Sequence, residues 1–354
     1  MNIALHNPMF SGASGLHGWI LEFIKAYKPA FYISDMRYLP RFFYFMHHHH
    51  LNPLHFKLLF SVKELNSYAD VLVCFNGHPY RQDSKPIKDF SGLKIYHLMD
   101  YTNFPTESNQ SLQDTGVNFV FGYARHDLYC PFFQKKYPRY KGKVIPIPFG
   151  FAERFQMNVP FEQRKDKVIA LGAVNSFSDP VHTVPDFQEL NDFYLARSEK
   201  FMHKFRRMLV EQEQNFLDFM DSKLPHYPQT KDFGYDLVQK FNEYKMFVSC
   251  ESLLYFPAGK TFEGPSAGAV MICSTHPCFS DYGFEDGINC VKHKEFDLED
   301  FKEKAVYYLE NEGKLEEIQK RGTEFMREQY SHPKVAERVF AMVEEKYEKK
   351  SVII

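Results

Sequence analysis

The chain has 354 residues, of which 44% are hydrophobic and 25% are charged, as is typical of well-packed globular domains. At about 100–200 residues per domain, this length favours two domains. Lys and Arg number 43 and Asp and Glu number 45, so the formal net charge is −2. The chain therefore lacks the strong basic excess that dedicated nucleic-acid binders carry, and we expect no nucleic-acid partner.

No run in the sequence reaches the ~18 apolar residues that a membrane-spanning helix needs. The first residues, MNIALHNPMF, lack the basic and apolar segments of a signal peptide and predict a strand. The six cysteines show no C-x-x-C pair and no zinc-ligand spacing, which is typical of a reducing compartment. We therefore expect a cytoplasmic protein. A peripheral contact at the inner face of the membrane, through the basic tail KYEKKSVII, stays open.

Short apolar runs alternate with helical patterns, which predicts an α/β chain with parallel sheets. In the first half, strands are expected at Ile3–His6, Ala30–Ile33, Val71–Phe75, Lys94–Leu98, Phe119–Gly122 and Val144–Ile147. The apolar spacing of Gly18–Tyr27 predicts a helix between the first two strands. Four consecutive histidines, His47–His50, have no Asp, Glu or Cys at ligand spacing, so a loop is expected there rather than a metal site.

The segment IPIPFGFAERF (Ile145–Phe155) contains two prolines and a glycine that interrupt regular structure, so it predicts a linker between domains. In the second half, strands are expected at Val168–Val174, Met246–Cys250 and Ala269–Cys273. Helical patterns cover Asp186–Leu224, Phe233–Tyr244, Leu298–Glu310, Leu315–Gln329 and Pro333–Lys349. The first of these is a polar insert whose role the sequence does not define.

The most informative motif is KTFEGPSAGAVMICS, residues 260 to 274. Lys260 is expected to face ligand phosphates as a point charge. Thr261 and the first backbone N–H groups of a helix form an anion site. Glu263, one turn further, suits the two hydroxyls of a ribose. The small Ser266 allows a close backbone approach, and Gly268 is expected in the left-handed conformation that ends a helix.

In this motif the sequence resembles the group 1 glycosyltransferases of the GT-B fold. Their C-terminal domain carries a pattern like E-A-x-A-x-G-x-x-V-I, and here E-G-P-S-A-G-A-V-M-I runs from Glu263 to Ile272. The resemblance implies that Glu263 binds the donor ribose, with Lys260 and Thr261 near the diphosphate. The linker IPIPFGF also resembles the family's I-P-N-G-V-D crossover.

The resemblance implies two facing Rossmann-like domains with a central cleft and a C-terminal helix that returns to the N-terminal domain. Residues 1–155 would bind the acceptor, residues 156–332 the nucleotide sugar, and residues 333–354 would pack back on the N-terminal domain. One position departs from the family pattern. Many members carry a second Glu eight residues before the ribose Glu, where this chain has Tyr255, and the nearest upstream carboxylate is Glu251. Whether transfer retains or inverts the anomeric configuration therefore stays open.

A second candidate site follows the first strand, where Gly12, Gly15 and Gly18 recur at three-residue spacing. Such a turn entering a helix brings backbone N–H groups to a ligand, although a plain tight turn explains the glycines as well. In GT-B enzymes this loop lines the cleft. By that resemblance Ser14, Gly15 and His17 are the candidate residues of the loop.

A third candidate site is KIYHLMDYTNFP, residues 94 to 105, where His97 and Asp100 end a predicted strand. Open α/β sheets place functional side chains there, and transfer to a hydroxyl benefits from a general base. In an inverting reaction one of them would deprotonate the acceptor, and in a retaining one it would steady the donor sugar. A helix cap and a buried core histidine are the structural alternatives. His126 and Asp127 are weaker candidates, since Asp127 could cap a helix.

No D-x-D pattern lies between the predicted strands, so a metal is not required, and Lys260 with helix N-termini could balance the leaving diphosphate. Arg206 or Arg207 could add positive charge there, although a solvated helix face is the favoured expectation for both. We expect a glycosyltransferase with no cofactor that uses a UDP-, GDP- or similar sugar as donor. Its acceptor would be a hydroxyl of a glycan, a lipid-linked saccharide or a protein. A non-catalytic nucleotide-sugar-binding partner and a GT-B epimerase or polyol-phosphate transferase are the alternatives.

Overall fold

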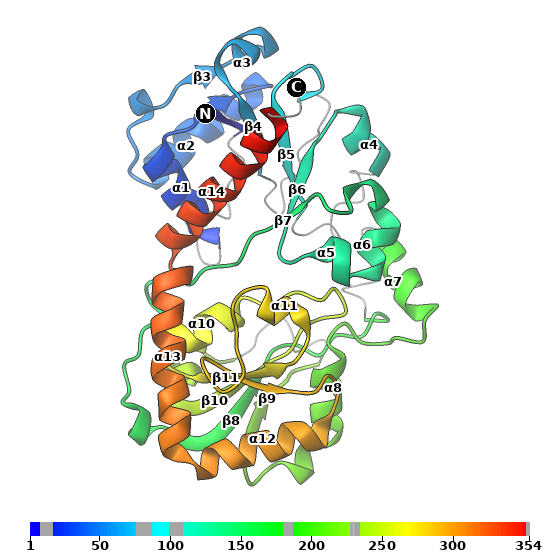
Figure 1. Ribbon diagram of the computed structural model, residues 1–354, viewed down its shortest axis with the longest axis vertical. Coiled ribbons are helices and arrows are strands. Elements are labelled where there is room, and N and C mark those ends of the chain that lie inside the picture. The colour runs from blue at the N-terminus through cyan, green and yellow to red at the C-terminus, as the bar shows by residue number, and fades with distance from the viewer. Residues whose placement is uncertain are drawn as a thin grey trace. The chain divides into compact units, whose positions relative to one another are not determined.

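The computed structural model describes residues 1–7, 17–75, 87–98, 109–179, 187–226, 229 and 234–351. The chain divides into two compact units (Figure 1). The first unit comprises Met1–Ile147 together with His332–Ile354, and the second comprises Pro148–Ser331.

Within its described residues, the first unit holds a seven-stranded sheet of order β3-β2-β1-β4-β5-β6-β7. Every pair is parallel. The strands are β1 (Ile3–His6), β2 (Ala30–Tyr32), β3 (Leu58–Leu59), β4 (Val71–Cys74), β5 (Leu93–His97), β6 (Phe119–Gly122) and β7 (Val144–Pro146). The six strands expected in this half are confirmed to within one residue at each end. The edge strand β3 was not expected, because two residues are too few to show a periodic pattern.

The helices of this unit are α1 (Trp19–Tyr27), α2 (Leu39–His48), α3 (Val62–Tyr68), α4 (Asn109–Asp114), α5 (His126–Tyr129), α6 (Pro131–Lys136) and α14 (His332–Ser351). Short 3₁₀ turns cover Met36–Tyr38, Pro53–His55 and Pro138–Tyr140. The loop expected at the histidine run is wrong for His47 and His48, which form the last turn of α2. The helix continues that far because Phe45 and Met46 are buried beneath it.

The C-terminal helix α14 packs against α1 inside the first unit. The rings of Tyr27 and Phe340 stack at 3.9 Å with an interplanar angle of 7°. Gly18 precedes α1 because a Cβ at this position would lie 2.4 Å from Nδ1 of His332. Trp19 is fully buried and meets Phe75 edge to face at 5.4 Å.

The described part of the second unit holds a five-stranded parallel sheet of order β12-β11-β10-β8-β9. Its strands are β8 (Lys165–Leu171), β9 (Met220–Lys223), β10 (Tyr244–Ser249), β11 (Val270–Ser274) and β12 (Val291–His293). The helical structure predicted for Asp186–Leu224 is therefore wrong at the C-terminal end, where Met220–Lys223 form a strand. Met220 and the preceding Phe216 and Phe219 are buried, and the chain there pairs with β8.

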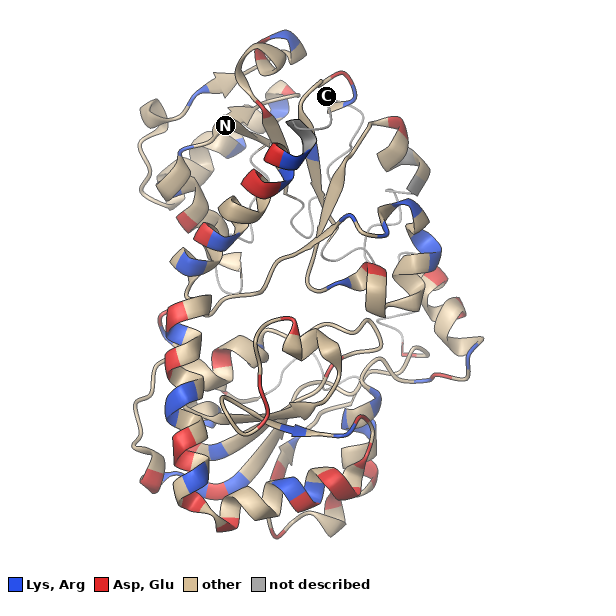
Figure 2. Ribbon diagram, viewed as in Figure 1, with Lys and Arg blue, Asp and Glu red and all other residues tan. Residues whose placement is uncertain are grey.

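The helices of this unit are α7 (Gln188–Leu195), α8 (Lys204–Glu211), α9 (Leu237–Glu243), α10 (Lys260–Ser266), α11 (Pro277–Ser280), α12 (Leu298–Glu310) and α13 (Glu312–Tyr330). Red and blue segments alternate along α12 and α13 (Figure 2), so their outer faces carry both signs of charge. Their inner faces bury Phe301, Leu315 and Ile318 in the core of the second unit. None of the helices the structure describes is long and apolar enough to span a bilayer.

One buried cation ties three elements of the second unit together. The guanidinium of Arg164 donates hydrogen bonds to the carbonyl oxygens of Val159 at 2.9 Å, Phe241 at 2.9 Å and Ala267 at 3.0 Å. Burial lowers the pKa of Arg164 to about 10. The side chain thereby joins the start of β8 to the ends of α9 and α10.

Substituting Arg164 by Met is expected to lower the free energy of unfolding by about 3 kcal/mol, because three buried carbonyl groups lose their donor. Chemical denaturation followed by circular dichroism measures the effect. The exposed Arg327 of α13 supplies the control, and Arg327→Met should change stability by less than about 0.5 kcal/mol. Equal stability of the two variants would contradict this role for Arg164.

Candidate functional site

The carboxyl ends of β8, β10 and β11 lie along one edge of the parallel sheet of the second unit, where open α/β folds bind ligands. The strand β8 ends at Leu171, three residues before the expected Val174, because Gly172 has a φ of 117°. A Cβ at Gly172 would lie 2.8 Å from Cζ of Arg206. Only glycine therefore fits the turn that this guanidinium packs against.

Two cationic side chains meet at this turn. Lys260, the first residue of α10, donates from Nζ to the carbonyl oxygen of Leu171 at 2.7 Å. Arg206, on α8, donates from Nη1 to the carbonyl oxygen of Ala173 at 3.0 Å. Burial, and then the positive charge of Arg206, lower the pKa of Lys260 to about 7. The positive charges converge with no carboxylate beside Lys260 among the described residues, which is the electrostatics of an anion site.

The expectation that Arg206 lies on a solvated face is wrong, because the residue is 6% exposed. Its Nε is buried and has no hydrogen-bond partner among the described residues. An unsatisfied buried donor costs free energy until an acceptor arrives. Arg207, the next residue, does follow the expectation and pairs with Glu211 at 2.8 Å on the outer side of α8.

Glu263 lies one turn into α10 and is only 7% exposed. Burial raises the pKa of its carboxyl group to about 7, an effect that the positive charge of Arg154 partly opposes. Within the described residues its carboxyl oxygens accept no hydrogen bond, so both are available to hydroxyl donors of a ligand. This is the carboxylate that the sequence predicted as the ribose ligand.

The other motif residues hold α10 in place. Thr261 is fully buried, and its hydroxyl shares a 2.7 Å hydrogen bond with Ser249 at the end of β10. The hydroxyl of Ser266 donates to the carbonyl oxygen of Glu263 at 2.7 Å. Gly268 has the expected left-handed conformation, with a φ of 81°. The backbone N–H of Thr261 bonds to Ala258 at 2.9 Å, so this donor is already used within the protein.

A second buried carboxylate lies just after β10. Glu251 is 5% exposed and accepts a hydrogen bond from the hydroxyl of Ser274 at 2.9 Å. Burial raises its pKa to about 7. Tyr255, where the family pattern has its second Glu, has a φ of 53° and stacks on His276 at 4.6 Å. From the sequence, Glu251 was noted only as a carboxylate that does not align with the second Glu of the family pattern. The structure buries it at the carboxyl edge of the sheet, where Lys260 and Glu263 also lie.

The first unit gathers aromatic and imidazole rings at the carboxyl edge of its own sheet. His97, the last residue of β5, lies edge to face with His17 at 6.5 Å. Nε2 of His17 lies 3.4 Å from the hydroxyl of Tyr123, which follows β6. Burial, and then the charge of His332, lower the pKa of His17 to about 4, so its imidazole is neutral at pH 7.

Several predicted site residues, namely Gly12, Ser14, Gly15 and Asp100, lie outside the described residues. Of the weaker pair, Asp127 accepts a hydrogen bond from the backbone N–H of Gly142 at 2.7 Å. Asp127 therefore ties α5 to a distant turn rather than capping a helix. Among the residues that the structure describes, no group of three His, Cys, Asp or Glu side chains could hold a metal ion.

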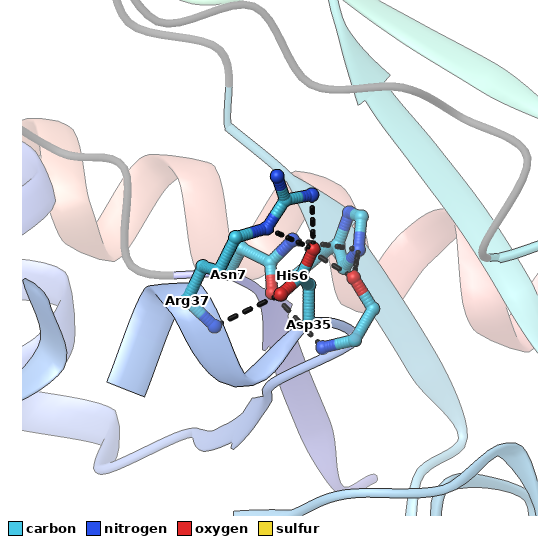
Figure 3. A network of polar contacts seen from close by, with 5 residues as sticks. His6, Asn7, Asp35 and Arg37 are labelled. Carbon is cyan, nitrogen blue, oxygen red and sulfur yellow. Dashed lines mark hydrogen bonds and ion pairs between the residues drawn. The ribbon is translucent and has the colours of Figure 1, made fainter. Parts of the chain in front are cut away.

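Figure 3 shows a polar network that fixes the chain where β1 ends. Nε2 of His6 lies 2.8 Å from the hydroxyl of Ser34, and Nδ2 of Asn7 donates to the same oxygen at 2.9 Å. Asn7 has a φ of 40° and accepts from the backbone N–H of Ser34 at 3.0 Å. Next to it, Asp35 pairs with Arg37. The network joins β1 to the turn that precedes α2. No motif in the sequence predicted it.

Residues 219–341 match the family described as glycosyl transferase-like. Solved structures of HepE from Anabaena share the fold. The complex with UDP has a TM-score of 0.52 at 9% identity, over 98% of this chain and 100% of that one. The complex with UDP and glucose gives 0.52 at 11% identity over the same shares. The complex with UDP-glucose gives 0.51 at 10% identity over the same shares.

The chain has the GT-B fold, and residues 219–341 are similar to glycosyltransferases. Both the resemblance inferred from the Glu263 motif and the predicted fold class are confirmed. No curated protein matches the sequence. The family match spans β9 to α14 of this GT-B chain and so includes α10 with Lys260 and Glu263.

The buried Glu263 makes stability depend on pH. Its folded-state pKa of about 7 lies above the unfolded value of about 4.3, so the native state binds more protons. The contribution of Glu263 to stability therefore falls as pH rises from about 4 to about 7. Glu263→Gln should raise the free energy of unfolding of the ligand-free protein by about 3 kcal/mol at pH 8 and by little at pH 4.

Thermal midpoints of both proteins at the two pH values measure this difference. The exposed Glu303 of α12 is the matched control, since Glu303→Gln should show no such pH dependence. A Glu263→Gln midpoint that follows wild type at both pH values would contradict the effect of burial on this carboxyl group.

Proposed function

We propose that the chain transfers a sugar from a UDP-sugar to a hydroxyl acceptor, with the donor bound by the second unit. The observation that carries the proposal is the pair of buried cations at Gly172, with a buried carboxylate one turn along α10 that accepts no hydrogen bond from the described residues. An anionic diphosphate and a ribose diol are the chemical complements of these two features. The family match supports a nucleotide-sugar donor, and the HepE complexes, which contain UDP and UDP-glucose, favour uridine as its base.

In this proposal Arg206 and Lys260 receive the diphosphate. The Nε of Arg206 gains an acceptor, and the nearby negative charge raises the pKa of Lys260 so that it carries a full charge. Glu263 accepts hydrogen bonds from the ribose hydroxyls, which releases the free energy stored in burying an unpaired carboxylate. As the glycosidic bond breaks, charge develops on the leaving diphosphate, and the two cations stabilise it there without a metal ion.

The first unit would supply the acceptor side. We propose that His97 and His17, with Asp100, surround the acceptor hydroxyl. In an inverting reaction His97 or Asp100 would accept the proton of this hydroxyl, and His17, whose low pKa makes it a weak base, would orient the hydroxyl. In a retaining reaction the same groups would steady the donor sugar. The acceptor hydroxyl would belong to a glycan, a lipid-linked saccharide or a protein.

UDP is expected to raise the thermal midpoint of the wild-type protein, because a ligand at 100 times its dissociation constant adds about 2.7 kcal/mol. Glu263→Ala should weaken UDP binding about 10- to 100-fold, since two charge-assisted hydrogen bonds are lost. Arg206→Met should do the same by removing a diphosphate contact. Glu303→Gln is the control and should bind UDP as wild type does. No shift with UDP or any other nucleoside diphosphate would sink the donor-site proposal.

His97→Ala separates catalysis from binding. It should lower kcat about 10²- to 10⁴-fold, the usual contribution of a positioned proton acceptor, while the UDP-induced shift in thermal midpoint stays unchanged. Release of UDP from UDP-sugar in the presence of candidate acceptors measures the rate. If wild type binds UDP but releases none with any acceptor, and His97→Ala is indistinguishable from it, the non-catalytic alternative is favoured.

A further inference from the structure

Exposed hydrophobic side chains concentrate in one segment of the first unit. Twelve large hydrophobic residues are exposed among those described, and five of them fall between residues 36 and 60. They are Met36 at 61%, Phe43 at 48%, Tyr44 at 69%, Leu54 at 89% and Phe60 at 46% exposure. Single exposed apolar side chains need no explanation, but a concentration of them marks an interaction surface.

The helix α2 (Figure 1) carries aromatic residues on both of its sides. Phe42, Phe45 and Met46 face the core and are buried. At helical spacing, Phe43 and Tyr44 fall on the opposite side, one turn before His47 and His48. The rings of Tyr44 and His48 stack at 5.9 Å. An ordinary surface helix carries polar residues on its outer side, so the aromatic side chains there require another reason.

The same segment is basic in a chain whose formal net charge is −2. Residues 36–63 contain four Lys or Arg, five His and no Asp or Glu. The nearest carboxylates in sequence are Asp35, which pairs with Arg37, and Glu64, which caps α3. Helices α12 and α13, by contrast, mix both signs of charge (Figure 2). A partner that accepts exposed aromatic groups and carries negative charge would complement this segment.

The α2 segment is held firmly on the body of the first unit. Phe42 packs edge to face on Phe31 of β2 at 5.1 Å. Asp35 caps the 3₁₀ turn before α2 by accepting from the backbone N–H of Arg37 at 2.9 Å (Figure 3). This turn follows Ser34, whose position is fixed by hydrogen bonds with His6 and Asn7 at the end of β1. A surface that is already ordered loses little conformational entropy when it binds.

We propose that the outer side of α2, comprising Arg41, Phe43, Tyr44, His47 and His48, docks on an anionic lipid bilayer together with Met36 of the preceding 3₁₀ turn. Amphipathic aromatic rings at the headgroup level, with basic side chains reaching the phosphates, are the chemistry by which helices lie in a membrane interface. The helix runs for 10 residues, so it lies on the bilayer and does not cross it. This assignment moves the expected peripheral contact from the C-terminal tail to α2. It does not depend on the proposed function, although docking there would favour an acceptor presented at a membrane.

Cosedimentation of the full chain with vesicles tests the assignment. Binding is expected to phosphatidylcholine vesicles that contain 30 mol% phosphatidylglycerol and to be at least tenfold weaker with phosphatidylcholine alone. Arg41→Gln should weaken binding about fivefold, because each basic residue near an anionic surface contributes about 1 kcal/mol. The double variant Phe43→Ser/Tyr44→Ser should weaken it at least tenfold. The matched control replaces Leu217 and Tyr307 of the second unit, 48% and 44% exposed, by Ser and should bind as wild type does.

Circular dichroism and thermal midpoints verify that each variant is folded, and the exposure of the replaced side chains makes unfolding unexpected. Binding that is absent, that is equal with and without phosphatidylglycerol, or that survives the double substitution would overturn the assignment. Light scattering after size-exclusion chromatography tests whether a second copy of the chain, rather than a bilayer, covers α2. A dimer that dissociates in the double variant, together with no vesicle binding, would assign α2 to contact between copies and also overturn it.

Discussion

Ionisable groups buried at the carboxyl edge of the five-stranded sheet set the chemistry of the second unit. Arg206, Lys260, Glu251 and Glu263 are all buried, at 5–8% exposure, and removing a charge from water costs several kcal/mol unless a partner compensates. Here Arg206 and Lys260 are hydrogen-bonded to backbone carbonyl oxygens, and Glu251 is hydrogen-bonded to Ser274. These contacts hold the side chains in place but supply no opposite charge. Burial accordingly shifts the pKa of Lys260 and of both carboxylates toward neutrality. A ligand with an anionic part and a diol would supply what this edge lacks.

The parallel topology explains why such a site arises at this edge. Each strand leaves the sheet in the same direction, so the turn after β8, the end of β10 and the start of α10 come together although they are distant in sequence. Gly172 matters most among these turns, because only a residue without a side chain lets the guanidinium of Arg206 lie against the backbone. The first unit repeats the arrangement with imidazole and phenol groups in place of charges. This difference is what one expects if one unit binds a charged donor and the other activates a neutral hydroxyl.

Much of the fold was predictable from the sequence, since buried parallel strands appear as short apolar runs such as those at Ile3–His6 and Phe119–Gly122. The strand β9 was missed because its sequence, MDSK, is polar and becomes a strand only through pairing with β8. The motif around Glu263 pointed to the right element. Arg206 was misassigned, and the bond of Lys260 to Leu171 was not anticipated, because both depend on contacts across the fold that local patterns do not encode. The lysine and its acceptor are 89 residues apart.

Hydrogen exchange of the full chain with and without saturating UDP tests the central claim most directly, because it locates the ligand on the backbone. We predict slower exchange in three segments that meet at Gly172: residues 171–176, helix α8, and residues 250–263. The first unit's helices α1 and α2 should exchange as before. Slowed exchange confined to other segments, or no change in these three at a UDP concentration that raises the thermal midpoint, would contradict a donor site at this edge of the sheet.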